Sequence, residues 1–280
     1  MTSGTPPAEG QEVQDRPDED NPAFDTSVAH ASRIYDYWLG GKDNYAVDRA
    51  AGDAALKAYP DLIHAVRSNR AFMTRAVRYL AAEAGIRQFL DIGTGIPTTP
   101  NTHETAQAVD PACRVVYVDN DPIVLAHARA LLTGAPEGAT DYLDADLRDT
   151  ATILDRAAQT LDFSQPVAIV LMAILHLIPD TDEPYRILAQ LVGAVPPGSY
   201  LALSQIASDI DVEEVSEARE QIGRYMPAKQ TYRSHAETMR FFAGLDLAEP
   251  GLVRITEWRP DTEDDATLPT ALWGGVARKG

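Results

Sequence analysis

The chain has 280 residues, a formal net charge of −18 and an isoelectric point near 4.6. Nucleic acids and anionic membranes are polyanions, so this charge argues against either of them as a partner. The single cysteine, Cys113, excludes an internal disulfide and a cysteine-based zinc site, and it fits a reducing, cytoplasmic setting. The longest apolar run, residues 167–178, is too short to span a bilayer.

The first 26 residues are rich in proline, glycine and acidic side chains. Seven carboxylates stand against one basic residue, Arg16. A segment of this composition buries too little apolar surface to fold on its own. We therefore expect residues 1–26 to form a disordered acidic arm that is simply solvated, with a regulatory role as the alternative.

Residues 27–84 predict a helical segment that caps the rest of the chain. The stretch 28–48 begins as an amphipathic helix, which the pair Gly40-Gly41 ends. Flat rings and polar side chains gather around this hinge, and such a mixture suits a lid over a ligand as well as it suits plain packing. The residues concerned are Arg33, Tyr35, Tyr37, Asn44 and Tyr45. Two further helices are predicted over 47–58 and 62–84.

A glycine-rich turn follows the first predicted strand. Residues 88–97 read Gln-Phe-Leu-Asp-Ile-Gly-Thr-Gly-Ile-Pro, which predicts a buried strand, a tight loop and then a helix. Gly93 and Gly95, with Thr94 between them, allow a ligand to approach the main chain closely. The dinucleotide fingerprint requires a third glycine, but Thr98 stands at that position.

A second strand is predicted over residues 114–119, and it ends in an acidic residue. Asp119 lies about 20 residues past the glycines, where a carboxylate is needed to bind the two ribose hydroxyls. A glycine loop and a ribose carboxylate together favour a bound nucleoside. The alternative is that both are ordinary strand ends of an α/β sheet.

The third predicted strand, from Thr140, ends in an acidic cluster. There Asp146 is placed to hydrogen-bond an adenine amino group, and Leu147 to pack on the ring. No metal site is expected, because the pair His103-Glu104 lacks the second histidine of a zinc helix.

The most apolar segment predicts a fourth strand, residues 167–172, covered on both faces. His176 follows it at the carboxyl edge of the sheet, where ligands bind, although a histidine in apolar sequence is more often a core residue. After a helix over 185–195 and a fifth strand over 199–206, residues 212–244 predict a helical insertion. The runs 251–258 and 271–278 predict an antiparallel pair of edge strands.

The alternation of strands and helices, the Asp91-Ile-Gly93-Thr-Gly95 loop and the acids at strand ends resemble class I S-adenosylmethionine-dependent methyltransferases. This resemblance implies a Rossmann-like, doubly wound, mostly parallel sheet of seven strands, in the order 3-2-1-4-5-7-6, over residues 85–280. It also implies that Ala173 and His176 flank the methionine end of the cofactor. Pro97 replaces the last glycine of the family's loop.

The likeness to one actinobacterial family, the S-adenosyl methyltransferases of unknown substrate, is closer still. It is carried by the run 33–45, by Asn69-Arg-Ala-Phe-Met, by 89–98 and by Tyr117-Val-Asp-Asn-Asp-Pro. It implies that the N-terminal helix caps the cofactor pocket. The cofactor-binding residues that we expect are Arg33, Asn44, Tyr45, Asp91, Gly93, Thr94, Gly95, Asp119, Asn120, Asp146, Leu147, Ala173 and His176.

The predicted function is methyl transfer to an oxygen or nitrogen atom of a small-molecule acceptor, for which secondary metabolism is one setting. His176 is the first candidate for a base, followed by Tyr37, Tyr45 and His235. Two alternatives stay open: a non-catalytic protein that binds the cofactor or S-adenosylhomocysteine, and a nicotinamide-dependent oxidoreductase. The oligomeric state is open, with a homodimer as one option.

Overall fold

The computed structural model describes residues 26–131, 134–226 and 229–280. The predicted acidic arm lies outside these residues except for Thr26. The helices are α1 (Ala31–Trp38), α2 (Ala46–Ala58), α3 (Leu62–Ala82), α4 (Thr102–Val109), α5 (Pro122–Leu131), α6 (Thr150–Ala157), α7 (Pro184–Ala194), α8 (Val212–Gly223), α9 (His235–Met239) and α10 (Glu263–Ala266). The strands are β1 (Gln88–Ile92), β2 (Arg114–Asp119), β3 (Ala139–Asp144), β4 (Ala168–Met172), β5 (Tyr200–Ile206), β6 (Leu245–Leu247), β7 (Val253–Arg254) and β8 (Leu272–Lys279).

One mixed sheet organises the chain, with strand order β3-β2-β1-β4-β5-β8-β6. The first five strands pair in parallel, and β8 runs antiparallel to both β5 and β6. This order confirms the predicted Rossmann-like fold, with β8 as the reversed strand. The sheet has eight strands rather than seven, because the short β7 pairs with β8 beside the main path.

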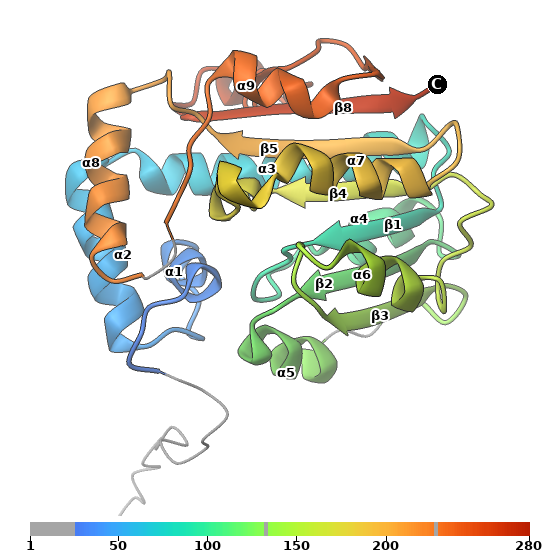
Figure 1. The fold of residues 1–280 in the computed structure, drawn as a ribbon, viewed down its shortest axis with the longest axis horizontal. Helices are drawn as coiled ribbons and strands as arrows, with labels where there is room; N and C mark the ends of the chain where they lie inside the picture. Colours follow the sequence, from blue (N-terminus) through green and yellow to red (C-terminus); the bar gives the residue numbers. More distant parts are fainter. Residues whose placement is uncertain (1–25, 132–133, 227–228) are drawn as a thin grey trace, which may run out of the picture.

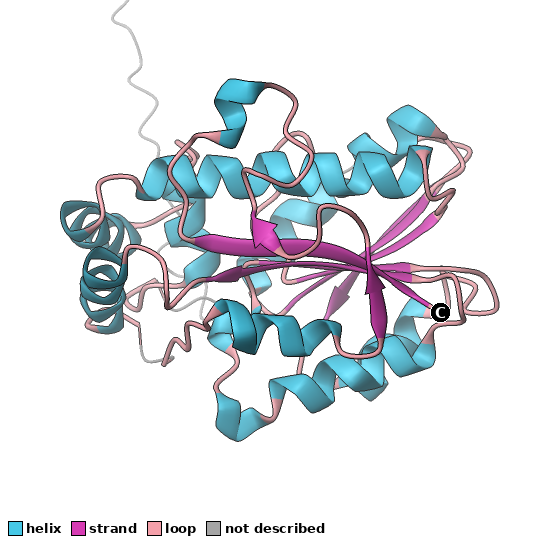
Figure 2. Cartoon of the chain, turned by 90° about the horizontal axis from the view of Figure 1, so that it is seen from above, coloured by secondary structure: helices cyan, strands magenta, loops and turns pink. Residues whose placement is uncertain are grey.

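Helices cover both faces of the sheet, with α3 and α4 behind it and α6 and α7 in front of it in Figure 1; Figure 2 shows the same layers from above. Alternation along each strand explains this arrangement, because successive side chains point to opposite faces. In β1, Phe89 joins the cluster beneath α3, whereas Leu90 joins the cluster beneath α6 and α7. Strands buried on both sides read as continuous apolar runs, as the sequence of β4 does.

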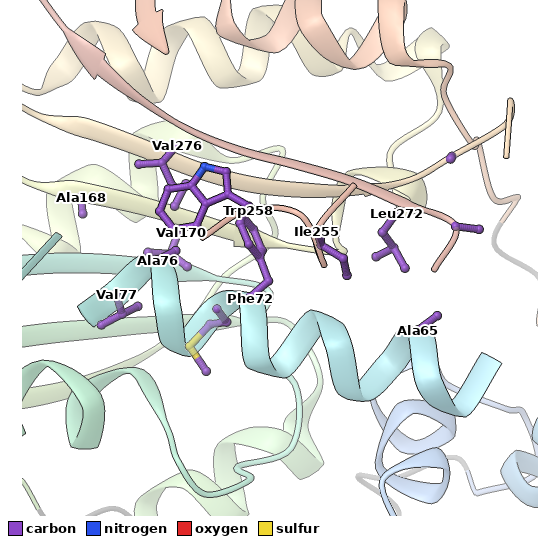
Figure 3. Close-up of a cluster of buried hydrophobic side chains, with 14 of the residues drawn as sticks. Ala65, Phe72, Ala76, Val77, Ala168, Val170, Ile255, Trp258, Leu272 and Val276 are labelled. Carbon is purple, nitrogen blue, oxygen red and sulfur yellow. The ribbon is translucent and has the colours of Figure 1, made fainter. Parts of the chain in front are cut away.

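The predicted strand over 251–258 is wrong for most of its length. Only Val253–Arg254 pairs with β8, and the edge strand is β6. The chain leaves the sheet because the buried guanidinium of Arg75 on α3 binds the carbonyls of Ile255 and Trp258, at 2.7 and 3.0 Å. The Trp258 ring then fills the space between α3 and the sheet, edge-on to Phe72 (Figure 3).

The helices of residues 27–84 do not form one separate unit. Helix α3 packs on β4, β5 and β8 and shares their buried cluster, whereas α1 and α2 lie at the end of the sheet to which the parallel strands point (Figure 1). Helix α8, the first part of the predicted insertion, packs against α2 at that end. Two distant parts of the sequence therefore meet beyond the carboxyl ends of the strands.

Two negative findings apply to the described residues alone. No helix among them is both long and apolar enough to cross a membrane. They also contain no cluster of three or more His, Cys, Asp or Glu side chains placed to hold a metal ion.

Replacing Trp258 tests the packing of the 255–258 turn. Trp258→Ala removes a fully buried ring that packs on Phe72 and Tyr79, so we expect it to lower the free energy of unfolding by about 3–5 kcal/mol. Urea unfolding measures the change. Trp273→Ala, at a half-buried position, is the matched control and should lose clearly less. An equal loss in both variants would contradict the packing described here.

Candidate active site

A cavity of about 660 Å³ opens at the carboxyl ends of the parallel strands. Its polar half is formed by α1 and by the loops that follow β1, β2, β3 and β4. The other half, which we call the apolar half, lies among Tyr59 at the end of α2, α3, α8 and the start of β8. Residues that line the apolar half include Tyr59, Leu62, Ala65, Val66, Ile206, Val215, Ala218, Ile222, Tyr232 and Leu272.

The glycine loop after β1 has the backbone that the sequence predicts. Gly93 and Gly95 adopt φ angles of +75° and +64°, which side chains disfavour. A Cβ at Gly93 would lie 2.5 Å from the Ile174 side chain, so the loops after β1 and β4 touch only because Gly93 has none. A Cβ at Gly95 would meet only Ser32, at 3.9 Å, so this backbone faces the cavity beneath α1.

Asp119 lies at the end of β2 and ties the loops together. One carboxylate oxygen accepts the Gly95 N–H at 2.8 Å, and the other accepts the Asp121 N–H at 2.9 Å. The side chain is buried, and burial raises its pKa against the lowering effect of these two backbone hydrogen bonds. Each carboxylate oxygen keeps a second lone pair, so Asp119 still has two acceptor positions for hydroxyl groups.

Asp91, at the end of β1, is a second buried acid in the cavity wall. Burial raises its pKa to about 6, although the hydroxyl of Thr102 donates to it at 2.6 Å and Arg70 lies nearby. Arg70 also lines the cavity, and its guanidinium donates to the carbonyls of Thr98 and Pro100. The loop after β1 is thus held by one acid and one base from different elements.

The third predicted acid, Asp146, meets Asn120 across the polar half. The Asn120 amide donates to Asp146 at 3.1 Å, and Arg148 pairs with the same carboxylate at 3.0 Å. Leu147 is buried and faces the cavity beside them. The structure therefore brings the strand-end residues together as the sequence predicts.

The turn after β4 has a constrained backbone. Ala173 adopts a φ of +51°, which is unusual for a residue with a Cβ, and its N–H is held by Ser204 of β5. The Ser204 hydroxyl donates to Asn69 at 2.6 Å, and the Asn69 amide donates to Tyr35 of α1 at 3.1 Å. Sequence reasoning did not assign Asn69 or Ser204 to the site. The run Asn69-Arg-Ala-Phe-Met, which carries part of the family resemblance, was the available signal for Asn69.

His176 lies on the short 3₁₀ turn Leu175–Leu177, in the cavity wall between the two halves. Its backbone carbonyl accepts the Thr231 N–H at 2.7 Å, and its ring meets the Tyr232 ring edge to face. Burial, together with the charge of Arg233, lowers the pKa of His176 to about 3. The imidazole is therefore neutral at physiological pH.

Three predicted site residues lie outside the cavity, and their contacts explain why. The Tyr37 hydroxyl donates to Asp53 near the surface, and the Asn44 amide donates to Asp36. Tyr45 begins α2 and packs on Arg33. These three contacts hold the turn between α1 and α2 together.

His235, the last of the sequence candidates for a base, packs on Trp273 away from the cavity. Arg33 does line the cavity, but its guanidinium serves the carbonyl of Val28 and the carboxylate of Asp48. Of the predicted bases, the structure leaves only His176 facing the cavity.

Helix α1 is fastened over the cavity by a contact that the sequence did not reveal. The Asp121 carboxylate accepts the Ser32 hydroxyl at 2.7 Å and lies 2.9 Å from the His30 ring. Burial alone would raise the pKa of Asp121, but the hydrogen bonds from His30 and Ser32 outweigh it and lower the pKa to about 2. We call these three residues the clasp.

The sequence of this protein matches one known family. A sequence model of the family described as S-adenosyl methyltransferase matches residues 17–280. The chain belongs to this family. S-adenosyl-L-methionine is therefore its cofactor, and methyl transfer is the class of reaction that it carries out. A comparison with curated proteins found no match.

Two solved structures resemble this S-adenosyl methyltransferase over nearly their whole length. A DUF574-family protein from Streptomyces avermitilis is 47% identical with a TM-score of 0.88, and the match covers 91% of this chain and 99% of that one. A candidate methyltransferase from Thermobifida fusca is 40% identical with a TM-score of 0.85, covering 92% and 97%. The resemblance seen in the sequence motifs is thus confirmed.

The raised pKa of Asp91 predicts a conflict between stability and cofactor binding in this S-adenosyl methyltransferase. Folding favours the protonated carboxyl, so its contribution to stability is present below about pH 4 and is lost as the pH rises through about 6. Asp91→Asn should therefore raise the free energy of unfolding at pH 7.5 by about 1–2 kcal/mol and weaken binding of the positively charged cofactor. Urea unfolding and calorimetric titration measure the two effects.

The control for this prediction is Asp144→Asn, at the exposed end of β3, which should change neither quantity. A stability difference between Asp91→Asn and the wild type that stays the same from pH 4 to pH 7.5 would contradict the burial argument.

Proposed function

We propose that this enzyme transfers the methyl group to an oxygen or nitrogen atom of a small molecule that occupies the apolar half of the cavity. One observation carries the proposal: a single cavity joins the glycine loop and Asp119 to a wall of apolar side chains. S-adenosylmethionine supplies an activated methyl group, so the protein mainly aligns the acceptor and excludes water. A cavity of about 660 Å³ suits a small molecule better than a macromolecule.

In this proposal the polar half holds the cofactor. Asp119 accepts the ribose hydroxyls, Asp146 meets the adenine amino group and Leu147 packs on the ring. The backbone of Gly93 and Gly95, together with Ala173, surrounds the methionine end. Two features favour this assignment: Gly95 opens toward the cavity, and Asp119 is held beside it by the Gly95 N–H.

Replacing Asp119 tests the cofactor assignment. Asp119→Ala removes two hydrogen bonds to the ribose and should lower the affinity for S-adenosylmethionine about 10- to 100-fold. Calorimetric titration with S-adenosylmethionine, S-adenosylhomocysteine and NAD measures it. Asp144→Ala, on the neighbouring strand and opposite Asp119, is the matched control and should bind like the wild type. Binding of NAD in place of the sulfur nucleosides would contradict the proposal and favour an oxidoreductase.

We also propose that α1 acts as the lid of the cofactor pocket, held shut by the clasp. His30 reaches both neighbouring elements, because its ring lies beside Asp121 and its backbone N–H donates to Asp48 on α2. The clasp therefore connects α1 to the loop after β2. His30, which belongs to the clasp, also connects it to α2. This loop begins with Asp119, so closing α1 and ordering the ribose site are coupled.

Breaking the clasp should open the lid without unfolding the sheet. Ser32→Ala removes one of the two side-chain contacts to Asp121, so we expect about three- to tenfold weaker cofactor binding and faster hydrogen exchange in α1. Tyr37→Phe removes the hydroxyl that binds Asp53 on the outer side of α1, and it should leave both measurements unchanged. Equal exchange rates in the Ser32 variant and the wild type would contradict a lid held by the clasp.

A further inference from the structure

The apolar half of the cavity carries no charged side chain among the described residues that line it. Its opposite walls come from α3, with Leu62, Ala65 and Val66, and from α8, with Val215, Ala218 and Ile222. The Asp, Glu, Lys and Arg residues that line the cavity lie on α1, on α3 at Arg70, at the ends of β1 and β2, or on the loop after β3. A charged molecule in the apolar half would lose its hydration and find no ion to replace it.

Several polar groups at this end of the cavity already have partners. The Tyr232 hydroxyl donates to Gln230 at 2.7 Å, and the Tyr59 hydroxyl donates to Asp211 at 3.2 Å. The Asn69 side chain is shared between Tyr35 and Ser204. These rings and amides therefore present flat surfaces to the cavity while their hydrogen bonds are used elsewhere. An acceptor with several hydroxyls would leave most of them unpaired.

His176 differs from these side chains. Its side chain is buried, its Nδ1 has no hydrogen-bond partner, and the ring lines the cavity where the two halves meet. A neutral imidazole offers one N–H and one lone pair, so it is able to orient one polar group of a ligand. It sits three residues after Ala173, which flanks the methionine end in the proposed function.

We propose that the acceptor is an uncharged aromatic molecule whose single polar group, a phenolic hydroxyl, lies against the His176 imidazole. This inference rests on the proposed function and adds the class of acceptor. The cavity wall offers Tyr59 and Tyr232 as flat faces and Met172 as a polarizable thioether, and both kinds of side chain pack well on an aromatic ring.

A phenol also suits the weak base in this wall. The phenolic oxygen forms a bond to the methyl carbon as the carbon–sulfur bond breaks, and the electron pair of that bond stays on sulfur, giving S-adenosylhomocysteine. The hydroxyl proton passes to the imidazole lone pair as the oxygen–carbon bond forms, because the oxygen becomes strongly acidic once it is methylated, and the imidazolium then releases the proton to water. A phenol has a pKa of about 10 and gives up this proton far more readily than an aliphatic alcohol, which requires a stronger base.

A series of compounds on one ring system tests the class of acceptor. The full-length protein is saturated with S-adenosylhomocysteine and titrated with 2-naphthol, 2-naphthoate, 2-naphthylamine and 2-naphthylmethanol. We expect 2-naphthol to bind about tenfold more tightly than 2-naphthoate. With S-adenosylmethionine, we expect the methyl ether of 2-naphthol to form and no product from the amine or the aliphatic alcohol. Tight binding of 2-naphthoate, methylation of another member alone, or no binding at all would overturn the proposal.

Two variants locate the binding. We expect the wild type to bind 2-naphthol about tenfold more tightly than naphthalene. His176→Phe keeps a flat ring, so it should leave the affinity for naphthalene unchanged and abolish this preference. Ala218→Phe fills the apolar half and should weaken 2-naphthol binding at least about tenfold, with the affinity for S-adenosylhomocysteine unchanged. Binding of 2-naphthol that neither variant alters would overturn the inference alone. Failure of S-adenosylhomocysteine to bind the wild type would instead overturn the proposed function beneath it.

Discussion

A buried carboxylate at the end of β2 fixes the arrangement of the whole cavity. Asp119 binds the N–H of Gly95 in the loop after β1 and the N–H of Asp121 in its own loop. Asp121 in turn holds Ser32 of α1. Two acids separated by one residue, Asp119 and Asp121, thus connect the loop after β1, the loop after β2 and α1. Without the carboxylate, two buried N–H groups would lose their partners, which is costly in an enclosed site.

The cavity keeps several charges out of water, and their energetic effects differ. Asp91 is destabilising at neutral pH, because burial raises its pKa, whereas Asp121 is stabilised as an anion by the clasp. Arg75 and Arg233 are buried but bind backbone carbonyls, so they act as fixed struts that position turns. The ionised Asp91 carboxylate therefore opposes folding at neutral pH, and the single hydroxyl bond from Thr102 does not offset its burial. Such a residue is expected where function, rather than stability, requires the charge.

Local sequence patterns predicted the elements whose causes are local. The β1 loop follows from two glycines that need positive φ, and α4 begins where Asn101 and Glu104 cap each other. The strand ends of β1, β2 and β3 brought Asp91, Asp119 and Asp146 to one edge because parallel strands end together. In these places the conformation that the local sequence favours is also the one that the whole fold requires.

The failures have the opposite origin. The run 251–258 has a strand-like composition, but contacts from Arg75, about 180 residues away, pull it out of the sheet. The clasp likewise joins residues separated by 89 positions, a pairing that no local periodicity reveals. Tyr37 and Asn44 were expected at the ligand because of their side-chain chemistry, yet a helix turn directs them to Asp53 and Asp36. Tertiary partners, rather than residue type, decided each case.

The division of the cavity into two halves follows from where its walls come from in the chain. The polar half is built on strand ends, whose positions the sheet fixes through its hydrogen bonds. The apolar half is lined largely by side chains of α3 and α8, together with Tyr59 just after α2, and α8 packs on α2 beyond the end of the sheet. Under the proposed function, α8 helps to shape the space for the acceptor, whereas the strand ends and their loops position the groups that bind the cofactor. The two tasks then fall to different parts of the fold, one fixed by the sheet and the other by helices packed at its end.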